Sequence, residues 1–175
     1  MADITFIKDK YSIKAGSSKD IPQILYFRKL LFQEMGVADN LLIDNVGETL
    51  LDLYTQEFKA DRIRHFIAYD NNDTPVAVVG GLLKNDFPYY LFKPGFYGWI
   101  IDVYTVPEQR GQGLAGKLLE LTTEWIKTKG AQEMKLIAAG KDARRLYERH
   151  GFRPTWEMSA NLTGIKTYNE IIDQR

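Results

Sequence analysis

Hydrophobic positions recur along the chain with two different periods, which predicts strands covered by helices. Apolar residues three and four apart predict helices at Ile21–Met35, around Leu50–Phe58, at Gly113–Gly130 and at Asp142–Gly151. Alternating or continuous short apolar runs predict strands at Ile4–Lys14, His65–Tyr69, Val76–Leu83, Trp99–Val106, Glu133–Ala139 and Phe152–Ala160. The succession of strand, helix and strand over residues 99–139 further predicts a parallel pair.

The run from Trp99 to Val106 is almost wholly apolar, as expected of a strand covered on both faces. Strict alternation predicts two faces: Trp99, Ile101, Val103 and Thr105 on one, and Ile100, Asp102, Tyr104 and Val106 on the other. Pro107 ends the strand because proline cannot donate to a continuing ladder. In the strand at 76–83, Gly80 and Gly81 indicate a bulge or a close backbone approach.

The start of the helix at 113–130 has the features of an anion site. The first turn of a helix has unpaired N–H groups and the positive end of the dipole. Gly111 and Gly113 lack Cβ atoms, so a phosphate can approach the backbone there. Arg110 adds a charge at the rim. The alternative is a tight turn that needs glycine, with Arg110 solvated.

Composition narrows the function classes. The 175 residues suit one domain, with a core at about 11–158 and a tail at 161–175. Lys and Arg together number 23, as do Asp and Glu, and zero net charge argues against a nucleic-acid partner. Without an apolar run of about 20 residues or a signal peptide, we expect no membrane partner. No cysteine is present, which excludes disulfides, thiolate metal sites and a cysteine nucleophile and is compatible with a cytoplasmic location. With two histidines, we expect no metal site.

Two sequence motifs point to a family. Gly111, Gly113 and Gly116 spell the dinucleotide fingerprint G-x-G-x-x-G. In a dinucleotide-binding unit, however, the first glycine follows the strand almost at once, whereas residues 107–110 intervene here. The segment Arg110–Ala115 better resembles the Q/R-x-x-G-x-G/A motif of the GNAT superfamily of N-acetyltransferases. Leu146–Phe152 resembles the L-Y-x-x-x-G-F segment of the same enzymes, and the resemblance covers about residues 11–158.

This resemblance implies a fold and a cofactor. The fold is α/β, with a central twisted mixed sheet of about six or seven strands flanked by helices. The cofactor is acetyl-CoA, whose pyrophosphate would lie on the loop formed by Arg110, Gly111, Gln112, Gly113, Leu114, Ala115 and Gly116. Its pantetheine arm would pair with the strand at Val103, Tyr104 and Thr105, where a bulge around Val103–Tyr104 would free a backbone amide. Gly140 stands where the family often has an asparagine, so that polar contact is not expected.

The resemblance also implies catalytic candidates. Tyr147 would protonate the departing coenzyme A thiolate, since a phenol is protonated at neutral pH; the alternative is that it packs in the core. From the residues themselves, Asp102 is the nearest candidate base, as an ionisable group in an apolar strand, the alternative being an ion pair across the sheet. Glu34 and Glu157 are weaker candidates.

Two further features bear on the substrate and on partners. Arg28 interrupts an apolar helix face. It is either a snorkelling or ion-paired arginine, or a substrate-binding arginine for a carboxylate. The aromatic stretch at 84–98 indicates a pocket wall or a subunit contact, hence a possible homodimer.

Three functions stay open. The first is N-acetyl transfer from acetyl-CoA to an amine of a small molecule or peptide, by direct transfer in a ternary complex. The second is a nucleotide-binding oxidoreductase, which rests on G-x-G-x-x-G alone. The third is a non-catalytic acyl-CoA sensor.

Overall fold

The computed structural model describes residues 5–7, 10–36, 45–138, 140–158, 160 and 162. Its strands are β1 (Thr5–Ile7), β2 (Tyr11–Ala15), β3 (Ile63–Tyr69), β4 (Pro75–Asn85), β5 (Phe96–Thr105) and β6 (Met134–Lys135). Its α-helices are α1 (Ile21–Glu34), α2 (Val46–Lys59), α3 (Leu114–Thr128) and α4 (Gly140–Arg149). Short 3₁₀ turns at Ser18–Asp20, Tyr90–Phe92 and Pro107–Gln109 complete the described elements.

The strands form one six-stranded mixed sheet in chain order, β1-β2-β3-β4-β5-β6. The first four pairings are antiparallel, and the pairing of β5 with β6 is parallel. The expected mixed sheet is therefore confirmed, as are the directions of β5 relative to its two neighbours. A wholly parallel sheet, which the oxidoreductase alternative requires, is not what the described strands form.

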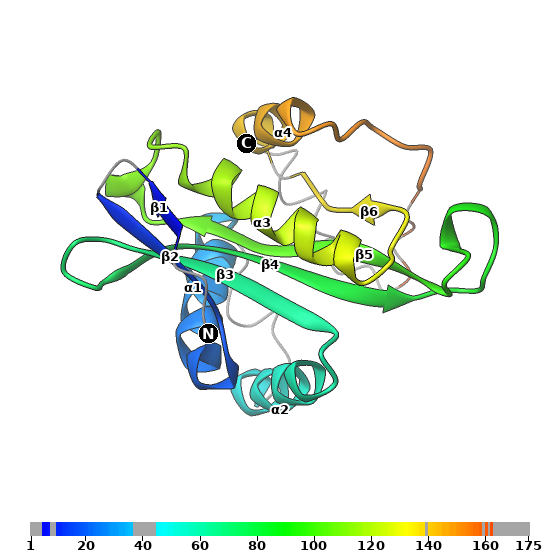
Figure 1. Ribbon diagram of the computed structural model, residues 1–175, viewed down its shortest axis with the longest axis horizontal. Helices are drawn as coiled ribbons and strands as arrows, with labels where there is room; N and C mark the ends of the chain where they lie inside the picture. The colour runs from blue at the N-terminus through cyan, green and yellow to red at the C-terminus, as the bar shows by residue number, and fades with distance from the viewer. Residues whose placement is uncertain are drawn as a thin grey trace.

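Helices cover both faces of this sheet (Figure 1), with α1 and α2 on one face and α3 and α4 on the other. Each face has its own core. The face under α1 and α2 buries Ile21, Ile24, Phe27, Tyr54, Ile63, Ile67, Val78 and Tyr104. The face under α3 buries, among others, Ala77, Val79, Ile100, Leu114, Leu118, Leu119, Ile126 and Tyr147. A strand between two such layers must be apolar on both sides, which accounts for the unbroken run in β4.

Three strand predictions are corrected. Residues 4–14 were expected to form one strand, but Thr5 pairs with Ile13, so the chain reverses into a hairpin. Within its described part, residues 133–138, the strand expected at 133–139 is only Met134–Lys135. The strand expected at 152–160 is absent from its described part, residues 152–158 and 160. Trp156 and Met158 are almost fully exposed there, so no buried face holds that segment in a sheet.

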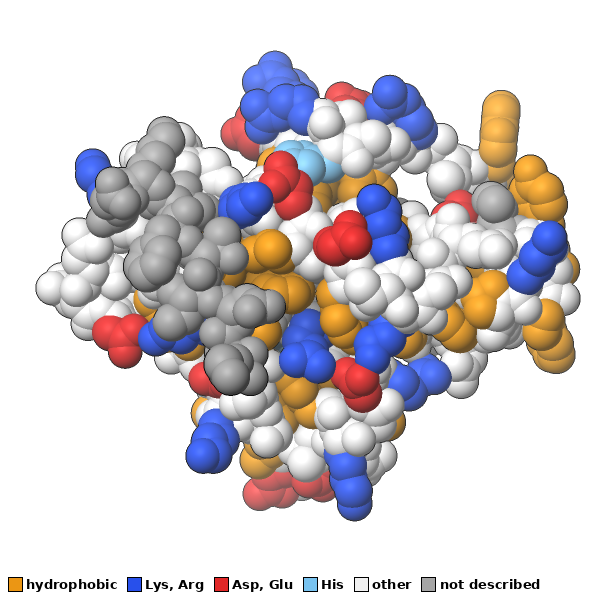
Figure 2. Space-filling model, in the orientation of Figure 1, with side chains coloured by type: hydrophobic (Ala, Val, Ile, Leu, Met, Phe, Trp, Pro, Cys, Tyr) orange, Lys and Arg blue, Asp and Glu red, His pale blue; other side chains and the backbone are white. Residues whose placement is uncertain are grey.

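The aromatic stretch after β4 divides between core and solvent. Phe92 is buried against Tyr97, while Phe87, Tyr89 and Tyr90 are exposed. Figure 2 shows hydrophobic side chains on the surface at this end of the molecule, on the right. A role for these side chains as a pocket wall or homodimer contact stays a prediction. Residues 37–44, between the helices predicted at 21–35 and 50–58, lie outside the described residues, as does nearly all of the 161–175 tail.

Candidate active site

The loop between β5 and α3 forms an open backbone cradle. Gly111 and Gly113 have φ values of +75° and +82°, in the left-handed region that favours glycine. A Cβ built on either residue would meet no atom of the described residues within 4 Å, so that part of the structure leaves both glycines open. Gly113 caps α3, and among the described residues no side chain caps the free N–H groups of its first turn. These groups, with the dipole of a 15-residue helix behind them, fit a diphosphate such as that of coenzyme A.

Arg110 is bonded to the protein although its side chain is exposed. Its Nη2 donates to both carboxylate oxygens of Glu34 at 2.7 Å, and its Nε donates to the carbonyl of Thr105 at 2.9 Å. The hydroxyl of Tyr104 also donates to Glu34, at 3.1 Å. Arg110 therefore links the cradle to the end of α1 and the end of β5. Its expected contact with a phosphate stays a prediction, and so does the base role of Glu34.

A β-bulge interrupts the pairing of β5 with β4. Val78 pairs with Tyr104 and Gly80 with Ile101, so the single residue Val79 stands opposite both Asp102 and Val103. The bulge thus lies one residue earlier than the expected Val103–Tyr104. Asp102 occupies the strained position of the bulge, with a left-handed φ of +54°.

The bulge also corrects the predicted faces of β5. Ile101 and Tyr104 pack on the α1 and α2 side, whereas Ile100 and Val103 pack on the α3 side. Strict alternation had paired Ile101 with Val103 and Ile100 with Tyr104, which is wrong. The extra residue shifts the alternation of side chains by one position. Residues after the bulge therefore lie on the opposite face from the one that strict alternation assigns relative to the residues before it.

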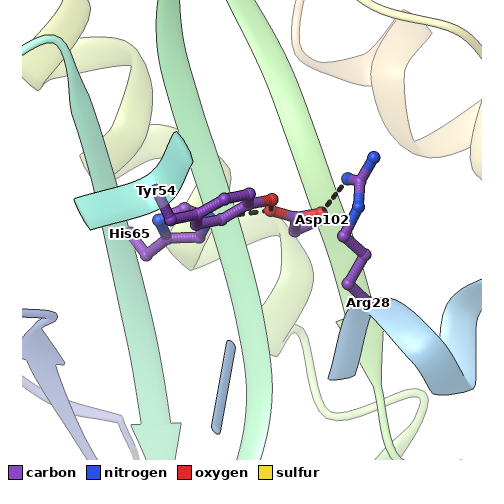
Figure 3. A network of polar contacts seen from close by, with 4 residues as sticks. All are labelled: Arg28, Tyr54, His65 and Asp102. Atoms are coloured by element: carbon purple, nitrogen blue, oxygen red, sulfur yellow. Dashed lines mark hydrogen bonds and ion pairs between the residues drawn. The ribbon is translucent and has the colours of Figure 1, made fainter. Parts of the chain in front are cut away.

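Asp102 is the centre of a buried polar network (Figure 3). Its side chain is fully enclosed and accepts from three elements. Arg28 Nη1 of α1 lies 2.5 Å from Oδ1, while the Tyr54 hydroxyl of α2 and His65 Nε2 of β3 lie 2.5 and 2.8 Å from Oδ2. Burial alone would raise the pKa of Asp102, but the hydrogen bond from His65 and the charge of Arg28 lower it to about 2. Asp102 is therefore an ionised acceptor.

The same network shifts the pKa values of its partners. Burial and the neighbouring Asp102 charge raise the pKa of Tyr54, which keeps its hydroxyl a donor. Burial would lower the pKa of Arg28, but the Asp102 carboxylate raises it above its usual value. Arg28 thus makes the ion pair that was its first interpretation, and contact with a substrate carboxylate stays a prediction. A carboxylate with so low a pKa is a weak proton acceptor, which weighs against Asp102 as the general base.

His65 reaches Asp102 across the whole width of β4. The two strands β3 and β5 both pair with β4, and Gly80 lies opposite His65. A Cβ on Gly80 would come within 2.4 Å of His65 Nε2, so only glycine leaves room for the ring. The ring is fully buried and stacks against Tyr54 and Phe58, with centroid distances of 5.6 and 5.8 Å. Its Nδ1 has no hydrogen-bond partner among the residues that the structure describes.

Sequence analysis did not identify Tyr54 and His65 as site residues. A signal was present for His65, because it occupies a buried position of the strand between Ile63 and Ile67. A buried polar side chain needs a partner. The partner could not be identified from spacing, because Asp102 is 37 residues away and reached only over a glycine.

The second sequence motif, Leu146–Phe152, packs directly against the start of α3, where the first motif ends. A Cβ on Gly116, in the first turn of α3, would lie 3.2 Å from the His150 ring and 3.8 Å from Leu146. Tyr147 is buried in the same core as Leu114 and Leu118, and its ring meets Phe152 edge-on at 5.9 Å. The core-packing interpretation of Tyr147 therefore holds for its ring, and the catalytic role of its hydroxyl stays a prediction. The missing Cβ of Gly116 makes room for α4.

The remaining predictions concern Glu157, metals and membranes. Glu157 forms an ion pair with Lys135 at β6, and its base role stays a prediction. Within the described residues, no group of three or more His, Cys, Asp or Glu side chains could hold a metal ion. No helix in the described part of the chain has the length and apolarity needed to cross a bilayer.

Comparisons with known proteins agree on one family. Residues 32–152 match the model of the acetyltransferase (GNAT) family. A predicted acetyltransferase from Clostridium acetobutylicum, solved with acetyl-CoA, is 27% identical with a TM-score of 0.78, over 87% of this chain and 96% of that one. A GCN5-related N-acetyltransferase from Ralstonia eutropha is 21% identical with a TM-score of 0.76, over 88% and 99%. An aminoglycoside 6'-N-acetyltransferase from Acinetobacter baumannii is 16% identical with a TM-score of 0.64, over 89% and 99%. No curated protein matches the sequence.

Proposed function

The chain belongs to the GNAT acetyltransferase family, and from that premise we propose that it transfers the acetyl group of acetyl-CoA to a primary amine of a small molecule or peptide. The open cradle at Gly111 and Gly113 is the observation that carries this proposal. Backbone amides from Gly111 to Gly116 would hold the diphosphate of the cofactor. The similar Clostridium acetobutylicum structure, which holds acetyl-CoA, supports the same assignment.

The unpaired edge of β5 supports a binding place for the pantetheine arm and the acetyl group of acetyl-CoA. β6 pairs with β5 only at Gly98 and Trp99, so no described strand pairs with the outer edge of β5 from Ile100 onward. Backbone groups on an unpaired edge are free to bond a ligand. The bulge lies on this length of strand, and Val103, Tyr104 and Thr105 are the residues that would bond the pantetheine arm. An N–H of the bulge would polarise the thioester oxygen.

Catalysis would then depend mainly on positioning. Acetyl-CoA supplies an acetyl group activated as a thioester, and holding it beside the amine accounts for most of the acceleration. Tyr147 would donate its phenolic proton to the departing sulfur. Because the chain has no cysteine, no acyl-cysteine can form and transfer would be direct, in a ternary complex.

Coenzyme A release in the presence of a panel of amines tests the proposal. The panel should include polyamines, amino acids, aminoglycosides and a peptide N-terminus, with free thiol as the readout. We expect at least one amine to give turnover above the rate of acetyl-CoA hydrolysis. A thermal shift with acetyl-CoA but no turnover with any amine would instead indicate an acyl-CoA sensor, because a ligand stabilises whatever binds it. A shift with NADH and none with acetyl-CoA would contradict both.

A further inference from the structure

The network around Asp102 is built on the β5 bulge, whose amide would polarise the thioester oxygen in the proposed reaction. Asp102 is itself a residue of the bulge, and its side chain points to the face covered by α1 and α2 (Figure 3). Its backbone has a left-handed φ of +54°, which aspartate adopts more readily than most residues but still at a cost in free energy. Such a conformation persists only where the surrounding structure holds it.

Three contacts hold it, each from a different element. Arg28, Tyr54 and His65 all donate to the same carboxylate, and they come from α1, α2 and β3. Two of the donors are themselves fixed: His65 and Tyr54 are buried and stack on each other. Charge-assisted hydrogen bonds to a fully buried carboxylate are strong and directional. A change in the backbone angles of Asp102 would therefore break several of them at once.

The arrangement of Gly80 and His65 indicates that the network serves the bulge rather than the general packing of this face. His65 could have been satisfied by a partner on its own strand or on an adjacent helix. Instead it crosses β4, over the one position where a glycine leaves room, to reach the bulge on β5. Within the described part of the chain its Nδ1 has no partner, and the hydrogen bond that the ring makes there is the one to Asp102.

We propose that Asp102, His65, Tyr54 and Arg28 form a latch that fixes the backbone of the bulge and so aims its amides at the acyl group. In this role Asp102 is a positioning residue, not a general base, and Tyr54 and His65 position the bulge through Asp102. The inference rests on the proposed function for its catalytic consequence. The effect of the network on the backbone of the bulge applies to the protein without any ligand.

Two variants test the latch. Tyr54→Phe keeps the ring that stacks on His65 and removes only the hydroxyl that bonds Asp102. Asp102→Asn keeps the size of the side chain and tolerates a left-handed φ, but it replaces one acceptor oxygen with a donor. Ile67→Val is the matched control, because Ile67 is equally buried on the same strand and face as His65 and lies outside the network.

The first readout is amide hydrogen exchange at residues 102–104, measured by NMR on the protein without ligand. We expect exchange to accelerate about tenfold or more in Tyr54→Phe and Asp102→Asn, and to stay as in the wild type in Ile67→Val. The second readout is steady-state kinetics with an accepted amine. A misaligned donor should lower kcat by about tenfold to a hundredfold while KM for acetyl-CoA changes little, because the cradle is untouched.

The outcomes separate the latch from the proposed function. Unchanged exchange at 102–104 in both network variants overturns the latch, as does faster exchange with an unchanged kcat. Equal effects of Ile67→Val and Tyr54→Phe on kcat also overturn it, because packing alone would then explain the loss. A wild type that acetylates no amine overturns the proposed function, and the exchange comparison still decides whether the network holds the bulge.

Discussion

Asp102 stays ionised although it is enclosed by protein, because three donors compensate for the water it has lost. Removing one donor and removing the carboxylate are therefore different perturbations. Without a donor the carboxylate is still partly satisfied, whereas without the carboxylate three buried donors lose their acceptor. The charge of this residue thus contributes to stability in a way that depends on pH.

The pH dependence has a definite sign. The pKa of Asp102 is about 2 in the folded protein, below its ordinary value of 3.8, so folding is stabilised above about pH 4 and loses that contribution as pH falls through 2. Asparagine does not titrate. The stability difference between wild type and Asp102→Asn should therefore shrink by roughly 2 kcal/mol between about pH 5 and pH 2. Urea unfolding over this range measures it, with Asp142→Asn as an exposed carboxylate control. A difference that does not change with pH would contradict the assignment.

Tyr147 allows its ring and its hydroxyl to be tested separately. If the hydroxyl protonates the leaving sulfur, Tyr147→Phe should lower kcat on the order of 100-fold with nearly unchanged acetyl-CoA affinity. Tyr147→Ala should also lower stability by a few kcal/mol, because the buried ring packs against Phe152. Kinetics and denaturant unfolding on both variants provide the two measurements. A Phe variant with normal kcat, where chemistry limits turnover, would leave Tyr147 with a packing role alone.

At the residue scale, important side chains were easier to predict from the sequence than the residues they contact. Asp102 and Arg28 stand out in the sequence as polar residues in apolar elements, and an ion pair was one interpretation of each. The sequence could not show that they pair with each other, since 74 residues separate them. Pairing at that distance depends on the register of the sheet, which a bulge at Asp102 has shifted.

At the scale of elements, the most predictable unit was β5, the cradle and α3. Proline and glycine mark its boundaries: Pro107 follows the strand, Gly113 caps the helix and Gly130 follows its end. Elements without such signals were placed less well. The helix α4 begins at Gly140, two residues before the expected Asp142, and residues 152–158 alternate in sequence without forming a strand.

The two ends of α3 provide a matched test of the cradle. Gly113 and Gly130 have similar left-handed φ values of +82° and +87°, and no described residue lies within 4 Å of a Cβ built on either. Valine at either position should cost similar backbone strain, about 1–2 kcal/mol. Only Gly113→Val should also weaken acetyl-CoA binding, about tenfold or more, because it blocks the amides of the first turn.

Calorimetric titration of acetyl-CoA into both variants and into Gln112→Ala measures the difference. Gln112→Ala should bind as the wild type does, since the contact proposed there is through the backbone. Equal losses in Gly113→Val and Gly130→Val would mean that strain, not the cradle, governs binding.

At the scale of the whole molecule, the sheet has a well-supported middle and weak edges. β4 is paired on both sides along nearly its full length and β3 from Phe66 to Tyr69, while β6 contributes two residues. Amide exchange should accordingly be slowest in β3 and β4 and fastest in β1 and β6. Exchange followed by mass spectrometry on the whole chain measures this order. Protection at Met134–Lys135 equal to that of β4 would show that β6 is held by more than its two pairs.

The convergence of three donors on Asp102 has a consequence for the order in which the chain can fold. During synthesis Arg28, Tyr54 and His65 all leave the ribosome before Asp102, by 74, 48 and 37 residues. A compact intermediate made of α1, α2 and β2–β4 would have to enclose these donors with no acceptor between them, which is unfavourable. We therefore expect the N-terminal half of the chain to remain open, and in need of protection from aggregation, until β5 has been translated.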